Sequence, residues 1–243
     1  MKMICMGIDI SDNDISCSEE IVDNVDNALA KLVDENIIFS KVSNVTGDDI
    51  AVTTIINDDS TLEDCNKMIY DILYDNALGF DDLNGVSKDK KDAGEGISYA
   101  EIDLNPDFYP DGIVVAFDTY CGESFVSDVA KKATKAALGM DNVGDISCSV
   151  VDEVKEIPGV GFVSSSTDDP VIIASIENTS DVGVVAGSII GAVLGYQNTY
   201  LVSRNTPCNV IPGSVIFSVS AIMNCNIIDL SHSFVHRCRL LEK

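Results

Sequence analysis

Basic residues are scarce in this sequence. Of 243 residues, 15 are Lys or Arg and 40 are Asp or Glu, so the formal net charge is −25. The imbalance is greatest in residues 1–111, which hold 26 acids and 7 bases. A surface this negative repels phosphate backbones and anionic lipids, so we expect no binding to nucleic acid or to a membrane surface. The charge favours either a solubilising surface suited to a salty cytoplasm or an acidic face for a basic partner.

Targeting features and long apolar runs are also lacking. The first residues, MKMICMGIDISDND, turn acidic at once, unlike a signal peptide. The longest run of apolar and small residues, 182–196, is shorter than the roughly 20 residues needed to span a bilayer. The eight cysteines are scattered without a CxxC pair and do not indicate a disulfide scaffold. We therefore expect a protein of the reducing cytoplasm.

Several sequence fingerprints of known chemistry are missing. The patterns GxGxxG, GxSxG, HExxH and the EF-hand loop do not occur. The sequence thus carries no nucleotide-binding fingerprint, and its candidate sites depend on the placement of single residues.

Apolar patterning predicts the same order of elements twice. Residues 4–9 (ICMGID) and 113–118 (IVVAFD) each indicate a buried strand that ends in Asp. Each is followed by a helix, two strands, a second helix and a strand. This order predicts an α+β protein of two tandem ferredoxin-like βαββαβ halves, each with a mainly antiparallel sheet and helices on one face. An α/β layered sheet of another order is the alternative.

The halves are expected at residues 1–104 and 105–243. Residues 205–243 are a β-rich C-terminal extension that either completes the second half or exchanges onto a neighbouring subunit. The polar, Gly-rich residues 78–96 indicate a mobile loop or a boundary.

A glycine repeat marks residues 181–196 in the second half. On a helix, glycines at every fourth position form one smooth stripe, and each disfavours the helix by about 1 kcal/mol relative to Ala. We expect close approach of another backbone to compensate, which would make this the most deeply packed helix. The glycines are Gly183, Gly187, Gly191 and Gly195.

The first candidate catalytic residues follow the strand 113–118. Asp118, Cys121 and Glu123 lie between this strand and a helix, where free backbone N–H groups attract ligands. A Cys before a helix has a lowered pKa, although flanking carboxylates oppose this. We assign proton transfer or nucleophilic attack to these three residues; a capped loop with an inert thiol is the alternative.

Candidate substrate-binding residues lie at two further turns. Ser164, Ser165 and Ser166 follow a GxG and offer hydroxyls to a polar group, although a hairpin explains them equally well. Arg204 is the only arginine before Arg237, and its guanidinium matches a carboxylate or phosphate. With Asn205 it would hold an anion; pairing of Arg204 with a local carboxylate is the alternative.

The only two histidines, His232 and His236, have i, i+4 spacing. On a helix both rings would share one face, where they could bind zinc or iron, but surface imidazoles without a metal are equally compatible.

The leading functional hypothesis is a cytoplasmic enzyme of small-molecule or coenzyme metabolism. Its anionic substrate would bind in a cleft between the two pseudo-repeats. The alternatives are a non-catalytic homo-oligomer that assembles through the Gly-rich helix and the C-terminal segment, and a divalent-metal-binding protein using the two histidines. The cofactor is left open, with a divalent metal as the one candidate.

Overall fold

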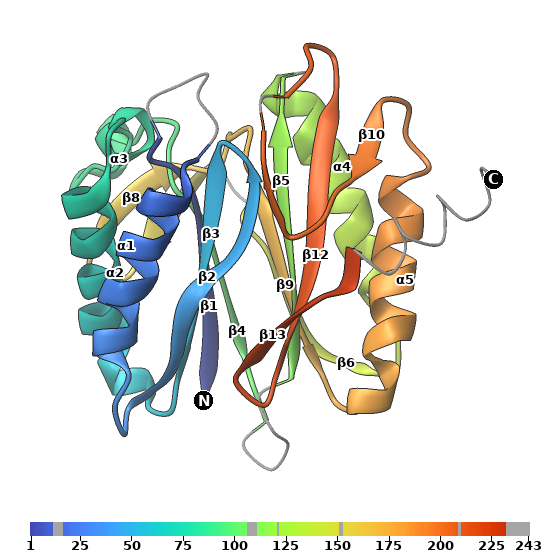
Figure 1. The fold of residues 1–243 in the computed structure, drawn as a ribbon, viewed down its shortest axis with the longest axis horizontal. Helices are drawn as coiled ribbons and strands as arrows, with labels where there is room; N and C mark the ends of the chain where they lie inside the picture. Colours follow the sequence, from blue (N-terminus) through green and yellow to red (C-terminus); the bar gives the residue numbers. More distant parts are fainter. Residues whose placement is uncertain (12–16, 106–110, 121, 151–152, 209, 232–243) are drawn as a thin grey trace.

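The computed structural model describes residues 1–11, 17–105, 111–120, 122–150, 153–208 and 210–231. Two β-sheets pack face to face, and each is covered on its outer face by two helices (Figure 1). Helices α1 (Glu19–Leu29) and α2 (Leu62–Asn76) cover the first sheet, and α4 (Glu123–Ala137) and α5 (Val182–Val193) cover the second. The expected α+β class with mainly antiparallel sheets is confirmed.

The first sheet has the strand order β11-β2-β3-β1-β4. All neighbours pair antiparallel except β11, which runs parallel to β2. The strands are β1 (Lys2–Asp9), β2 (Ile37–Gly47), β3 (Asp49–Ile56), β4 (Ser98–Asp103) and β11 (Asn205–Pro207).

The second sheet has the order β10-β12-β5-β9-β6, with β13 also paired to β12. Its central pairs, β12 with β5 and β5 with β9, are antiparallel, whereas β10 runs parallel to β12. The strands are β5 (Gly112–Thr119), β6 (Val143–Cys148), β9 (Val171–Ile176), β10 (Thr199–Leu201), β12 (Val215–Met223) and β13 (Asn226–Asp229).

The apolar core has three layers because each sheet is buried on both faces. One layer lies between the first sheet and its helices, and another between the second sheet and its helices. The third joins the inner faces of the two sheets and includes Met3, Phe39, Ile55, Val114 and Ile173. Because both sheets are covered on both faces, every residue of β3 and of β5 is buried, without the alternation of buried and exposed residues seen in a half-exposed strand.

A buried polar cluster also joins the two sheets. Asn44 on β2 donates through Nδ2 to Ser218 Oγ on β12 at 2.7 Å and accepts from Ser220 Oγ at 2.8 Å. The hydroxyl of Thr46 lies 2.6 Å from that of Ser218. Because these buried groups satisfy one another across the interface, they fix how the sheets align.

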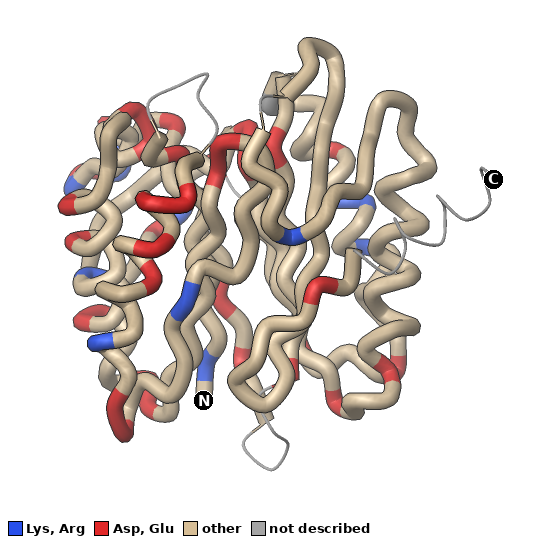
Figure 2. Tube along the Cα trace, in the orientation of Figure 1, with Lys and Arg blue, Asp and Glu red and all other residues tan. Residues whose placement is uncertain are grey.

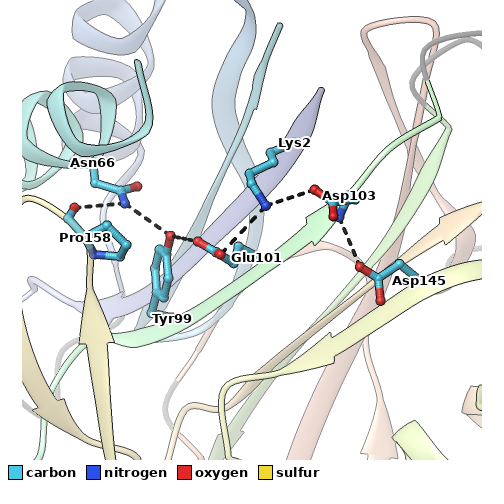
Figure 3. Close-up of polar contacts among 7 residues, drawn as sticks. All are labelled: Lys2, Asn66, Tyr99, Glu101, Asp103, Asp145 and Pro158. Atoms are coloured by element: carbon cyan, nitrogen blue, oxygen red, sulfur yellow. Dashed lines mark hydrogen bonds and ion pairs between the residues drawn. The ribbon is translucent and has the colours of Figure 1, made fainter. Parts of the chain in front are cut away.

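Further polar contacts tie the two halves together at β4 (Figure 3). Asn66 on α2 donates to the Tyr99 hydroxyl and to the carbonyl of Pro158, both at 3.1 Å. At the other end of β4, the backbone N–H of Asp103 donates to Asp145 Oδ2 at 3.0 Å. Pro158 and Asp145 belong to the second half of the chain, so these bonds cross the junction.

Two segments of the second half extend onto the first. The hairpin β7 (Val154–Ile157) and β8 (Gly161–Ser164) contributes Ile157 and Val163 to the core under the first sheet. Strand β11, in the expected C-terminal extension, pairs with β2 rather than with the second sheet, while β12 lies beside β5. The C-terminal extension therefore contributes strands to both sheets.

Residues 78–96 do not form a boundary between the sheets. They contain the short helix α3 (Asp81–Asn84) and a 3₁₀ turn (Lys90–Asp92), and Leu83 is buried in the first core. Ser87 forms a β-bridge with Phe162 of the hairpin.

The prediction for the glycine stripe is wrong. The helix exists as α5, but Gly183 and Gly191 are exposed, and a Cβ built on Gly183, Gly187 or Gly191 meets nothing within 4 Å. The face that packs is the opposite one, which carries Val185, Ile189 and Val193. The two-sheet layout does not depend on the stripe, because the sheets pack through the strands' own side chains.

Among the described residues, none of the helices has both the length and the apolar character required to cross a membrane.

Candidate metal centre

An acidic pocket of about 390 Å³ opens where the first strands of both halves end. In Figure 2 acidic segments lie near the turn that joins β2 to β3 and near the upper part of β5, and others are spread over the helices beside the first sheet. Among the described residues that line this pocket, none is Lys or Arg. The lining carboxylates are Asp9, Asp48, Asp49, Asp81, Asp82, Glu95, Asp118 and Asp168.

The tight turn between β2 and β3 places two of these carboxylates. Gly47 has φ +72°, a left-handed conformation that glycine adopts at little cost, and Asp48 and Asp49 follow it directly. A Cβ on Gly47 would overlap the carboxylate of Asp118, which comes from β5 in the other sheet. The turn therefore brings Asp48 and Asp49 against Asp118, and each of the three offers an oxygen within 4.8 Å of the others.

Burial and mutual repulsion keep protons on this cluster. Burial, followed by the charge of Asp48, raises the pKa of Asp118 to about 9. Burial and then Asp118 raise the pKa of Asp49 well above its ordinary value. Since carboxylates this close cannot all ionise without a counter-charge, the cluster needs either protons or a cation at neutral pH.

Two carboxylate oxygens in this region are buried without a hydrogen-bond partner. They are Oδ2 of Asp118 and Oδ2 of Asp169, in residues that are 6% and 4% exposed. The other oxygen of Asp169 accepts from Ser98 Oγ at 3.3 Å and from the Thr167 hydroxyl. Buried carboxylate oxygens are normally satisfied, so each orphaned oxygen calls for an explanation, which is either an ion or, for Asp118, a proton shared with the neighbouring carboxyl of Asp48.

The turn at α3 adds a further carboxylate. Asp82 Oδ2 accepts the backbone N–H of Asp9 at 2.8 Å, and Asp9 Oδ1 in turn accepts the Ser11 N–H at 2.8 Å. Burial is the main cause that raises the pKa of Asp82 to about 7, with Asp9 and Asp168 adding to it. Residues 81–82 therefore belong to the pocket wall.

This donor set suits a hard divalent cation. Carboxylate and hydroxyl oxygens are the ligands that Mg²⁺, Mn²⁺ and Ca²⁺ prefer, whereas zinc and iron sites are usually richer in His and Cys. A cation between Asp48, Asp49 and Asp118 would compensate their charge and satisfy the buried oxygen of Asp118. The residues present thus fit such an ion.

Three catalytic residues are predicted from the sequence. Among those whose side chains the structure describes, only Asp118 lines the acidic pocket. Cys121 lies outside the described residues. Glu123 is the first residue of α4. Tyr120, also a pocket residue, is exposed at its rim.

The predicted substrate-binding residues lie elsewhere. Ser164, Ser165 and Ser166 line a separate cavity of about 610 Å³ against α4, beside Ser127 and Lys131.

Arg204 and Asn205 sit at the edge of the first sheet. Arg204 Nη1 donates to the carbonyl of Ser43 at 2.9 Å, and neither residue lines the acidic pocket. The structure therefore does not gather Asp118, the serines and Arg204 into the single cleft that was expected. His232 and His236 lie outside the described residues.

The sequence interpretation missed most of the pocket's carboxylates. An available signal was the repeated Asp-Asp pair near the start of the third main strand of each half, GDDIAV at 47–52 and TDDPVI at 167–172. The first-strand aspartates Asp9 and Asp118, which the repeated strand pattern also marks, both line the pocket, and of the two only Asp118 is a predicted site residue.

Comparison with known proteins identifies the family. Residues 2–238 match the family described as "Uncharacterised conserved protein UCP005278", so the chain belongs to this family. It is 48% identical over 242 residues to an uncharacterized protein of Methanothermobacter thermautotrophicus, covering 100% of this chain and 98% of the relative. It is 39% identical over 228 residues to uncharacterized protein MJ1676 of Methanocaldococcus jannaschii, covering 94% of each.

Solved structures show only distant similarity. An unknown protein from Galdieria sulphuraria aligns with 91% of this chain and 98% of its own at 12% identity and a TM-score of 0.25. An anthrone oxidase-like protein aligns with 94% and 92% at 8% identity and a TM-score of 0.34. Both TM-scores are too low for either structure to inform the fold or chemistry of this chain.

Proposed function

We propose that this protein is a divalent-cation-dependent enzyme of small-molecule metabolism whose acidic pocket binds Mg²⁺ or Mn²⁺. The observation that carries the proposal is the carboxylate of Asp118, which is buried against Asp48 and Asp49 with one oxygen unpartnered. A cation is the partner that would satisfy this oxygen and neutralise the cluster at the same time.

The cation also determines which substrates are possible. Eight carboxylates and no Lys or Arg line the described pocket, so an anionic substrate is repelled unless metal ions intervene. Mg²⁺ is typically bound through a few carboxylates and keeps positions open for water or for substrate phosphate oxygens. The anionic substrate is therefore a phosphorylated small molecule bound through the metal, and the anion-binding role assigned to Arg204 passes to the cation.

In this proposal the reaction is metal-assisted hydrolysis or phosphoryl transfer. A divalent ion bound there would supply Lewis-acid chemistry to a phosphoryl group and would make a water molecule more acidic. Asp48, Asp49 and Asp118 would hold the ion, and a neighbouring carboxylate such as Asp82 would exchange the proton.

We further infer that the two sheets are tandem ferredoxin-like halves. The four strands β2-β3-β1-β4 of the first sheet and β6-β9-β5-β12 of the second occur in corresponding orders. On this assignment β10 and β11 are additions to the edges, and the pocket lies at the junction of the halves. A cytoplasmic location remains part of the proposal.

Binding of Mn²⁺ to chelator-treated protein tests the metal site. We expect saturable binding by calorimetry, and a loss of at least tenfold in affinity in Asp118→Asn. Asp23→Asn removes an exposed carboxylate on α1 and should bind Mn²⁺ like the wild type. Equal affinities in Asp118→Asn and the wild type would reject the assignment.

A second measurement tests the enzymatic role. A panel of phosphorylated metabolites is assayed for phosphate release with Mg²⁺ or Mn²⁺ present. Metal-dependent turnover that Asp118→Asn abolishes and Asp23→Asn retains supports the proposal. A protein that binds Mn²⁺ at Asp118 and turns over none of the phosphorylated substrates would be a cation-binding protein instead.

Assembly into a homo-oligomer is a second candidate role, and the exposed face of α5 favours it. This helix carries no charged residue, and Val184 and Leu194 beside its glycines are 56% and 46% exposed. In a chain of net charge −25, two copies avoid repulsion by meeting at an uncharged face. We propose that a second copy of this chain covers α5.

A further inference from the structure

Aspartates occupy matching positions in the two sheets. In the first sheet, Asp9 at the end of β1 is the direct partner of Asp49 at the start of β3. In the second, β5 and β9 pair from Gly112 with Ser175 to Ala116 with Val171, and the Phe117 N–H donates to the Pro170 carbonyl at 3.1 Å. Continuing this register by two residues places Asp118 opposite Asp169.

Each of these pairs is accompanied by one more carboxylate. Asp48 precedes Asp49, and Asp168 precedes Asp169. Asp48 and Asp168 both line the pocket. Each half therefore carries a first-strand Asp and an Asp-Asp pair at this end of its sheet, and all of these residues except Asp169 line the pocket. The two sets have the same order along the chain.

The compact cluster already described mixes these two sets. It consists of the Asp-Asp pair of the first half, Asp48 and Asp49, and the first-strand Asp of the second half, Asp118. Exchanging the halves converts this set into Asp168 and Asp169 with Asp9.

We infer that the pocket is a two-cation centre, in which each divalent ion is bound by the Asp-Asp pair of one half together with the first-strand Asp of the other half. This inference rests on the proposed function, because it adds a second ion to the metal site proposed there. A pair of ions would act on opposite sides of one phosphoryl group, as two-metal sites do.

The second subsite has its own evidence. Oδ2 of Asp169 is buried and unpartnered, as Oδ2 of Asp118 is in the first subsite. After burial, the charges of Asp82 and Asp168, both pocket residues, are the main causes that raise the pKa of Asp169. Asp82 also accepts the backbone N–H of Asp9, which ties the first-strand Asp to this side of the pocket.

The two proposed subsites differ in how close together their carboxylate oxygens lie. Among the described residues, only Asp48, Asp49 and Asp118 are drawn together within 4.8 Å. The second set must close around its ion, and this movement reduces its affinity. We therefore expect two binding steps, with the site at Asp48 the tighter.

Matched variants at Asp48 and Asp168 test this arrangement with Mn²⁺ as the probe. The side chains are partly or fully exposed, so Asn at either position should leave the fold intact. Calorimetry of the wild type should give two Mn²⁺ per chain. Asp48→Asn should weaken the tighter step at least tenfold, Asp168→Asn should weaken the other step at least tenfold, and Asp23→Asn should change neither.

Electron paramagnetic resonance of the same samples tests whether the ions are neighbours. With two equivalents of Mn²⁺ the wild type should show a spin-coupled spectrum, and Asp168→Asn with one equivalent should show the six lines of an isolated ion. One Mn²⁺ per chain, lost in Asp48→Asn and unaffected in Asp168→Asn, would overturn the two-cation centre and leave the proposed function standing. No Mn²⁺ binding by the wild type would overturn both.

Discussion

Gly47 leaves free the space that the carboxylate of Asp118 occupies. A Cβ at position 47 would overlap Oδ2 of Asp118, and the backbone there has φ +72°. The two residues belong to different sheets, so this contact joins the β2–β3 turn of the first half to the end of β5 in the second half. It explains why the turn sequence Gly-Asp-Asp lies at the centre of the acidic pocket.

Gly47→Ala should therefore lose both stability and metal affinity. The positive φ alone costs about 1 kcal/mol for a residue with a Cβ, and the overlap displaces Asp118 in addition. Calorimetry with Mn²⁺ should show at least tenfold weaker binding. Gly213→Ala is the matched control, because Gly213 has φ +84° with nothing within 4 Å of its Cβ. If both variants bind Mn²⁺ like the wild type, Gly47 does not position Asp118.

Chelator-treated protein should become less stable as the pH rises. In the folded state the pKa of Asp118 is about 9 and that of Asp82 about 7, whereas both are near 4 in an unfolded chain. Between these limits the folded protein holds protons that the unfolded chain has released, so the free energy of unfolding falls with increasing pH. The melting temperature in EDTA should be lower at pH 8 than at pH 6, by about 3 °C or more.

Saturating Mn²⁺ should oppose this trend, because the ion binds the deprotonated carboxylates. Asp118→Asn, in EDTA, should show a smaller pH dependence than the wild type. A metal-free wild type that is equally stable at both pH values, or more stable at pH 8, would show that the cluster ionises without cost.

Asn44→Ala should destabilise the packing of the two sheets. The side chain is fully buried, and its removal leaves the Ser220 hydroxyl without this partner and the Ser218 hydroxyl with only that of Thr46. Unsatisfied buried groups cost about 1–3 kcal/mol each, so chemical denaturation should show a loss of about 2–3 kcal/mol. Asn226→Ala, at an exposed position, should change stability by less than about 0.5 kcal/mol. Similar losses of stability in both variants would show that the buried polar cluster between the two sheets contributes no more than an exposed side chain does.

Val184→Glu should abolish self-association through α5. A carboxylate at this exposed position would place like charges against each other in the proposed assembly. Light scattering should give the mass of a single chain for the variant and a multiple of it for the wild type. Val33→Glu, at another exposed valine, should leave the wild-type mass unchanged. A wild type with the mass of one chain would remove this candidate role.

The order of elements was predictable because the local signals were strong. The apolar runs before Asp9 and Asp118 are typical of buried strands, and the structure confirms both. The Asp at or near the end of each of these strands lines the pocket. The separation of the serines and Arg204 from this pocket was not predictable, because it depends on how two sheets pack.

The glycine stripe misled for a physical reason. Periodic glycines mark a smooth helix face, but the sequence does not say whether that face meets the chain's own backbone or lies open. In α5 the bulky residues of the opposite face already fill the core, so the glycines are left outside. The Asp-Asp repeat was equally visible, yet separate aspartates in an acidic chain resemble ordinary surface charge until register places them together.

Anomalous scattering from a crystal soaked in Mn²⁺ tests the central claim most directly. The account predicts an anomalous peak within coordination distance of carboxylate oxygens of Asp48, Asp49 and Asp118, about 2.0–2.6 Å for a hard divalent ion. A soaked crystal with no peak among these three residues, or with Mn²⁺ bound only elsewhere on the surface, would contradict it.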